Sequence, residues 1–190
     1  IGLLPATAWA ANETTYVLAG SDFQARKGHS EGAGTVSTIL DNIVVDYPTM
    51  DGFLFAGDYD VNYDDSANGK ATLQDTVQEV YGEGMHEVYG QGNHDADNLV
   101  GNTLNASGAN DASDYGVFLI NEKDYMWYND DEATIKNTAS KLETYLNTKR
   151  NAEYKKPIFV VSHLPLHYNM RTRTSGNGDG KYANYIVTLR

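Results

Sequence analysis

Asn93 and His94 stand side by side within residues 92–95, a glycine-flanked segment that combines two kinds of chemistry. The side-chain oxygen of Asn93 suits a divalent cation, and the imidazole of His94 can donate a proton or a hydrogen bond to an anion. Asparagine and histidine beside glycine also occur in ordinary turns. The segment by itself therefore leaves a turn and a reactive site open as alternatives.

Three other polar clusters follow apolar runs, as residues 92–95 follow the short run at residues 87–89. The runs at residues 15–19, 52–56 and 157–161 are largely continuous, which is typical of strands buried on both faces. The polar residues that follow these runs are Asp22 and Gln24, Asp58, and His163. Because ligands in open α/β sheets collect at the carboxyl ends of the strands, we expect the four clusters to converge.

The residue types in these clusters favour a centre for divalent metal ions. Two carboxylates, one amide oxygen and one imidazole nitrogen are offered by Asp22, Asp58, Asn93 and His163. Mixed oxygen and nitrogen donors suit Mn, Fe, Zn or Mg. A shared carboxylate can hold two such ions about 3.5–4 Å apart, where they activate water for an in-line displacement. His94 could then stabilise a transferred phosphoryl group or protonate the leaving oxygen.

Helical periodicity separates the predicted strands. Apolar residues at i, i+3, i+4 and i+7 predict helices across residues 36–44, 73–81 and 135–146. The order is strand, helix, strand, helix, strand, an irregular stretch, helix and strand, which predicts a largely parallel sheet with right-handed crossovers. Residues 95–114 are rich in small polar residues and are expected to form a long surface loop, which could form a rim of the site.

Composition narrows the class of protein. A chain of 190 residues can form one α/β domain with a sizeable core. The net charge of −12 argues against nucleic acid as a main partner, and the absence of cysteine excludes disulfides and thiolate metal sites. No stretch is long enough to span a membrane. Residues 1–12 resemble the end of a signal peptide, with Ala8 and Ala10 at an A-x-A cleavage site, so we expect export and a domain at residues 13–190.

The ordered motifs around Asp22, Asp58, residues 92–95 and His163 resemble those of the calcineurin-like metallophosphoesterases, over residues 16–167. This resemblance implies an α/β fold with two packed, mainly mixed β-sheets flanked by helices, an αββα sandwich. It also implies that Asp58 bridges two divalent metal ions and that Asp22 binds the first. Asn93 and His163 would bind the second ion, and His94 would act on the leaving group.

The chain departs from the pattern of this family at three places. Gln24 stands where the family usually has histidine, and we expect its side-chain oxygen to serve as a metal ligand. Val61 stands where many relatives have an aspartate, with Asp60 one position earlier, so the partner that orients His94 stays open. The closing Gly-His-x-His motif is absent before Arg190, so the domain is expected to be truncated at its C-terminus, with an incomplete active site.

Other residues have weaker signals. His167, Arg171 and Arg173 could contact a phosphate-ester substrate, although a rim position or ordinary solvent exposure is the simpler alternative. His86 is expected to have a structural or surface role, and Tyr59 is expected to pack in the core.

Two functions follow. The first is a secreted metal-dependent phosphoesterase that hydrolyses phosphomono- or diesters with water activated by two metal ions. The alternative is a catalytically weakened relative that serves as a binding or surface module. Substrate identity, native metals and oligomeric state stay open.

Overall fold

The computed structural model describes residues 14–23, 30–60, 65–95, 104–125 and 132–163. These ranges form an α/β fold with two three-stranded sheets and four helices. In chain order the elements are β1 (Val17–Gly20), α1 (Ser30–Asp46), β2 (Gly52–Phe55), α2 (Ser66–Tyr81), β3 (His86–Tyr89), β4 (Gly108–Ala109), β5 (Gly116–Ile120), α3 (Glu122–Tyr125), α4 (Glu132–Asn151) and β6 (Ile158–Ser162). Among these residues, no helix combines the length and the apolar composition that crossing a bilayer demands.

The two sheets differ in strand direction. The first sheet has the order β1-β2-β3, and all its strands run parallel, as the βαβ pattern predicts. The second sheet has the order β4-β5-β6 and is mixed, because β4 runs antiparallel to β5 while β5 and β6 are parallel. The expectation of mainly mixed sheets therefore holds for the second sheet alone, within the described strands.

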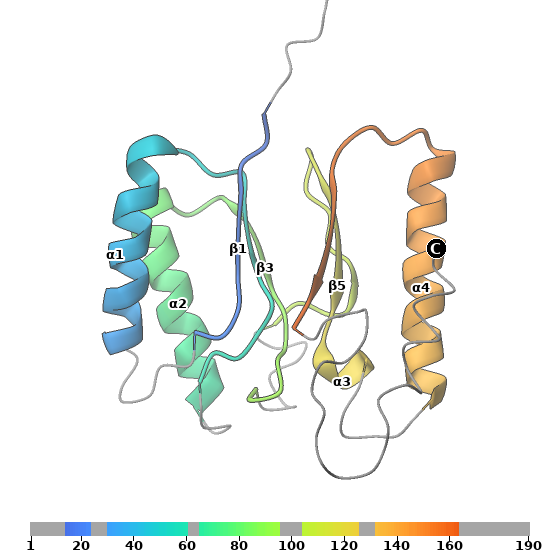
Figure 1. Ribbon diagram of the computed structural model, residues 1–190, viewed down its shortest axis with the longest axis horizontal. Coiled ribbons are helices and arrows are strands. Elements are labelled where there is room, and N and C mark those ends of the chain that lie inside the picture. The colour runs from blue at the N-terminus through green and yellow to red at the C-terminus, as the bar shows by residue number, and fades with distance from the viewer. Residues whose placement is uncertain (1–13, 24–29, 61–64, 96–103, 126–131, 164–190) are drawn as a thin grey trace, which may run out of the picture.

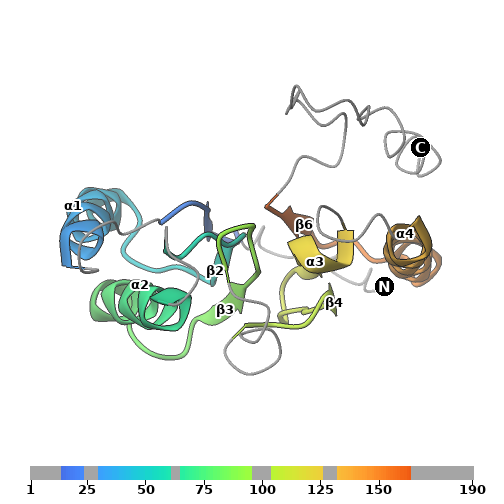
Figure 2. The ribbon, with the colours of Figure 1, turned by 90° about the horizontal axis from the view of Figure 1, so that it is seen from below.

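The sheets lie face to face, with helices on their outer faces. Figures 1 and 2 show α1 and α2 over the first sheet and α4 over the second. Strand β2 shows the alternation that this arrangement requires. Its Phe53 and Phe55 pack in the core that also holds Leu40 of α1 and Leu73 of α2, whereas Leu54 belongs to the core between the sheets. The second core consists of Leu54, Val88, Tyr115, Val117, Leu119 and Val161.

Strand β5 was not predicted from the sequence. The sequence analysis expected an irregular stretch before the third predicted helix, where the structure has this strand. All five of its residues are buried, at the centre of the second sheet. The predicted surface loop at residues 95–114 is also wrong in part. Leu104 lies in the core of the helix-covered face, and Asn105 bonds to Tyr89 through both its backbone and its side chain. Side chains that complete backbone hydrogen bonds let this polar segment lie against β3, although its composition is that of a loop.

A buried asparagine after β5 joins the two sheets at their carboxyl ends. The Oδ1 atom of Asn121 accepts a hydrogen bond from the backbone N–H of Gln91 at 2.7 Å. Its amide nitrogen donates to the carbonyl of Asn105 at 2.9 Å. Both groups would be costly to leave without partners in a buried position. Asn121 therefore fixes the segment that precedes Asn93 and His94.

Some predictions fall outside the described residues. They are the predictions on the signal-peptide segment at residues 1–12, on Gln24, on Val61, on residues 96–103 of the predicted loop, and on everything after His163.

Replacing a side chain between the sheets should destabilise the fold more than replacing one on the outer face of the same sheet. Leu119 has no exposed surface, whereas Val160 of β6 is 38% exposed. We expect Leu119→Ala to lower the free energy of unfolding by about 3 kcal/mol, because a cavity adds to the lost burial. Val160→Ala should cost less than about 1 kcal/mol. Urea denaturation measures both, and equal losses would contradict the assignment of the inter-sheet core.

Stability should also depend on pH through His86, at the opposite end of β3 from Asn93. Its Nδ1 lies 2.8 Å from the hydroxyl of Tyr115. Burial lowers the pKa of His86 below its ordinary value, against a smaller opposing effect of the Asp111 charge. The unfolded state then binds this proton more readily than the folded state. The free energy of unfolding should therefore fall as the pH drops below about 6.5. The difference between wild type and His86→Gln, measured by urea denaturation from pH 7.5 to 5, isolates this effect; parallel curves would contradict it.

Candidate metal centre

The candidate ligands come together from both sheets. Asp22 follows β1, Asp58 follows β2, and His163 directly follows β6. One potential ligand atom from each of these residues lies within 4.8 Å of the other two. In Figure 1 these strands run toward the lower part of the view, so their carboxyl ends meet on one side of the sandwich. The predicted convergence of strand ends is thus confirmed for these three residues.

Both aspartates have a backbone conformation that side chains rarely adopt. Asp22 has φ 60° and Asp58 has φ 63°, in the left-handed region. This conformation costs a non-glycine residue about 1 kcal/mol and is often found at functional sites. The N–H of Asp22 donates to the carbonyl of Gly57 at 2.9 Å, which ties the ends of β1 and β2 together. The structure therefore holds both carboxylates in place through strained turns.

The turn after β2 contacts the turn after β3 so closely that side chains are excluded. Gly57 has φ 113°, and a Cβ atom there would overlap the backbone of Gly92. A Cβ atom at Gly92 would in turn overlap the carboxylate of Asp58. Glycine is required at both positions because two backbones and a carboxylate share this space.

His163 faces two oxygen atoms with one nitrogen. Its Nε2 lies 3.1 Å from Oδ1 of Asn93 and 3.5 Å from Oδ2 of Asp58. The side chains of His163 and Asp58 are only 4% and 1% exposed. The Nδ1 atom of His163 is buried with no hydrogen-bond partner among the described residues. Buried nitrogen and oxygen donors that point at one another suit a divalent cation, which would satisfy them together.

The donor set fits a metal ion. Asp22, Asp58 and His163 supply two carboxylates and an imidazole, and Asn93 adds an amide oxygen within hydrogen-bond distance of that imidazole. Carboxylates also neutralise the charge of a dication at short range. These four residues are the described members of the predicted set. Gln24, His167, Arg171 and Arg173 lie outside the described residues, so their predicted roles stay predictions.

Two hydrogen bonds of its backbone hold His94 in place. Its N–H donates to Oδ1 of Asp58 at 2.9 Å, and its carbonyl accepts from the hydroxyl of Ser66 at 3.1 Å. Ser66 is the first residue of α2, so the turn is attached to a helix as well as to Asp58. The half-buried side chain of His94 belongs to the same turn as the candidate ligand Asn93.

Asp95 received no role from the sequence, but in the structure its carboxylate accepts three backbone hydrogen bonds. Its carboxylate accepts from the backbone N–H groups of Asp58 at 2.8 Å, Tyr59 at 3.0 Å and Gly92 at 2.8 Å. Burial raises the pKa of Asp95, although the three N–H donors act in the opposite direction. The sequence signal covers only the local bond with Gly92, since aspartate commonly bonds nearby backbone in turns, and the bonds to Asp58 and Tyr59 have no local signal.

Tyr59, beside Asp58, and His86, at the far end of β3, have the structural roles that the sequence indicated. Tyr59 is completely buried and donates its hydroxyl hydrogen bond to the carbonyl of Gly90 at 2.8 Å, so it packs in the core. Burial raises the pKa of this hydroxyl, with Asp95 adding to the effect. His86 has the expected structural role through Tyr115.

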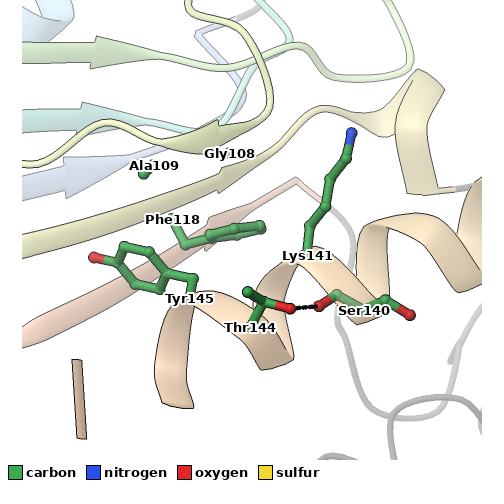
Figure 3. A pocket seen from close by; sticks show the side chains of 7 residues that line it. All are labelled: Gly108, Ala109, Phe118, Ser140, Lys141, Thr144 and Tyr145. Atoms are coloured by element: carbon green, nitrogen blue, oxygen red, sulfur yellow. Dashed lines mark hydrogen bonds between the residues drawn. The ribbon is translucent and has the colours of Figure 1, made fainter. Parts of the chain in front are cut away.

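A pocket lies away from the candidate metal ligands. Figure 3 shows this pocket of about 400 Å³ between α4 and the β4–β5 pair, where Phe118 and Tyr145 supply ring surfaces and Lys141 stands nearby. None of the candidate ligands lines it. We therefore assign it no part in the metal chemistry.

Comparison with known proteins adds no relative to this description. No family model matches the chain, and no curated protein is significantly similar to it.

A divalent metal ion should stabilise the folded chain through Asp58. At a concentration 100 times its Kd, a ligand that binds only the folded state contributes about 2.7 kcal/mol, which is a rise in Tm of about 5–10 °C for a domain of this size. We expect this rise with Mn²⁺ or Zn²⁺ in wild type and its loss in Asp58→Asn. Asp114→Asn is the control, because Asp114 is an exposed carboxylate that pairs with Lys156. Equal shifts in all three proteins, measured by differential scanning fluorimetry, would contradict the site.

Proposed function

We propose that this protein is a metal-dependent phosphoesterase of the calcineurin-like type, which hydrolyses phosphomono- or diesters with water activated by two divalent metal ions. The observation that carries the proposal is the convergence of Asp22, Asp58 and His163 from three separate strands. Carboxylates and imidazole within such a short distance of one another are an arrangement that suits metal-assisted hydrolysis.

Each described residue has a role in this proposal. Asp58 lies centrally, with its Oδ2 toward His163, and would be the ligand that two ions share. Asn93 and His163 would hold one ion, and Asp22 would hold the other with Gln24. When bound, the ions would supply Lewis-acid polarisation of the phosphate and activation of a water nucleophile.

His94 is the residue proposed to act on the leaving group. It is adjacent to Asn93, and its backbone hydrogen bond to Asp58 limits how far its imidazole can move from the metal ligands. An imidazole in this position can donate a hydrogen bond to a phosphoryl oxygen or give a proton to the leaving oxygen. A carboxylate-rich centre without bound cations would repel a phosphate ester, so substrate binding depends on the metal.

Hydrolysis should require both the metal ligands and His94. In the full-length protein, with Mn²⁺, Zn²⁺ or Mg²⁺ and p-nitrophenyl or bis-p-nitrophenyl phosphate as substrate, we expect activity that a chelator abolishes. Asp58→Asn should reduce turnover to background, and His94→Gln should lower kcat by about 10²–10⁴-fold. The matched control is His86→Gln, because His86 lies at the far end of β3. It should leave kcat unchanged at pH 7.5.

Two results would overturn the enzymatic proposal. Turnover that persists in chelator, or in Asp58→Asn, would exclude the metal-dependent mechanism. Metal binding without turnover of either ester by the full-length protein would instead favour the alternative function, a catalytically weakened binding module.

A further inference from the structure

We propose that Asp95 is a positioning residue whose carboxylate holds Asp58 in the geometry of a metal ligand. The inference rests on the proposed function, because it concerns the same metal centre. It assigns a role to the last residue of the 92–95 segment, which the predicted ligand set leaves unused.

The carboxylate of Asp95 joins two turns that are far apart in sequence. Its Oδ2 accepts from the N–H groups of both Asp58 and Gly92, each at 2.8 Å. Its Oδ1 accepts from the N–H of Tyr59 at 3.0 Å. One buried side chain, 3% exposed, therefore bonds to the turn after β2 and to the turn after β3 at the same time.

These contacts hold the backbone of Asp58 in its left-handed conformation. Asp58 has the left-handed backbone conformation, which an aspartate leaves readily unless the surrounding groups hold it. Asp95 bonds to the N–H of that very residue and to the next one. The side chain of Asp58 is held from the other turn, because Oδ1 accepts from the N–H of His94. Its Oδ2 is thereby left facing His163.

An amide could not replace the carboxylate of Asp95. All three contacts are N–H groups that need an acceptor, and both carboxylate oxygens are used. Asparagine would place an NH₂ group against at least one of these donors, in a site where the two backbones already touch at Gly57 and Gly92. The turns would then have to separate, and Asp58 would lose its position relative to His163.

The experiment compares Asp95→Asn with Asp111→Asn. The control is closely matched, since the carboxylate of Asp111 also receives three hydrogen bonds, from the N–H of Val117, the hydroxyl of Tyr145 and the ammonium of Lys149. Asp111 lies on the β5–α4 side, away from the metal centre. We expect both variants to lower Tm. Only Asp95→Asn should raise the Kd for Mn²⁺, by at least tenfold, as measured by isothermal titration calorimetry and by electron paramagnetic resonance.

Amide hydrogen exchange in the metal-free wild type gives a second measurement that needs no variant. We expect the amides of Asp58, Tyr59 and Gly92 to be protected, because each donates to Asp95. Rapid exchange at all three would overturn the inference. If Asp95→Asn does not fold, Asp95→Glu takes its place, because it keeps the charge but displaces the carboxylate by one methylene group.

The outcomes separate this inference from the proposed function. If wild type binds Mn²⁺ and Asp95→Asn binds it equally well, the positioning role is wrong and the metal centre stands. If both variants weaken binding to the same degree, Asp95 matters only through general stability, and the positioning role is again wrong. If wild type itself binds neither Mn²⁺ nor Zn²⁺, both the inference and the proposed metal centre fail.

Discussion

The packing of the two sheets against each other decides where every candidate ligand lies. Asp58 follows a strand of the first sheet and His163 follows a strand of the second, yet Nε2 of His163 and Oδ2 of Asp58 are 3.5 Å apart. Their approach depends on the apolar contact between residues such as Leu54 and Leu119, which sets how the strand ends align. Directional bonds then refine the alignment, since Asn121 links the second sheet to Gln91 of the first. The hydrophobic core supplies the stabilisation, and the buried polar bonds supply the register.

The same junction concentrates negative charge in a poorly solvated place. The carboxylates of Asp58 and Asp95 are both nearly inaccessible, and Asp22 lies within reach of Asp58. Backbone N–H groups offset part of the desolvation cost, three for Asp95 and one for Asp58. A divalent cation beside Asp22, Asp58 and His163 would supply counter-charge to these carboxylates, which supports the proposed metal centre.

Much of this arrangement could be predicted from the sequence because strand ends have clear signals. The continuous apolar runs before Asp22, Asp58 and His163 predicted three strands within a residue or two of their observed bounds. Apolar residues at i, i+3, i+4 and i+7 predicted helices within α1, α2 and α4. Strand β5 was missed although its run is equally apolar, because the polar segment before it suggested one long loop. Asn121 and Asp95 were missed for a different reason. Their roles arise from contacts with distant backbone groups, and no local pattern in the sequence reports which N–H a carboxylate or amide will meet in space.

The candidate metal ligands differ in how far they are exposed to solvent. Asp58 and His163 are buried, whereas Asp22 is exposed and its carboxylate accepts a hydrogen bond from its neighbour Ser21. Coulomb attraction is stronger where water is excluded, so an ion beside Asp58 and His163 would be held more firmly than one beside Asp22. In the proposed hydrolysis, the exposed side is where water and a phosphate ester would enter. His94 is half-buried and attached to Asp58 through its backbone, so in that proposal it would donate a proton to the leaving group from the border between the two sides.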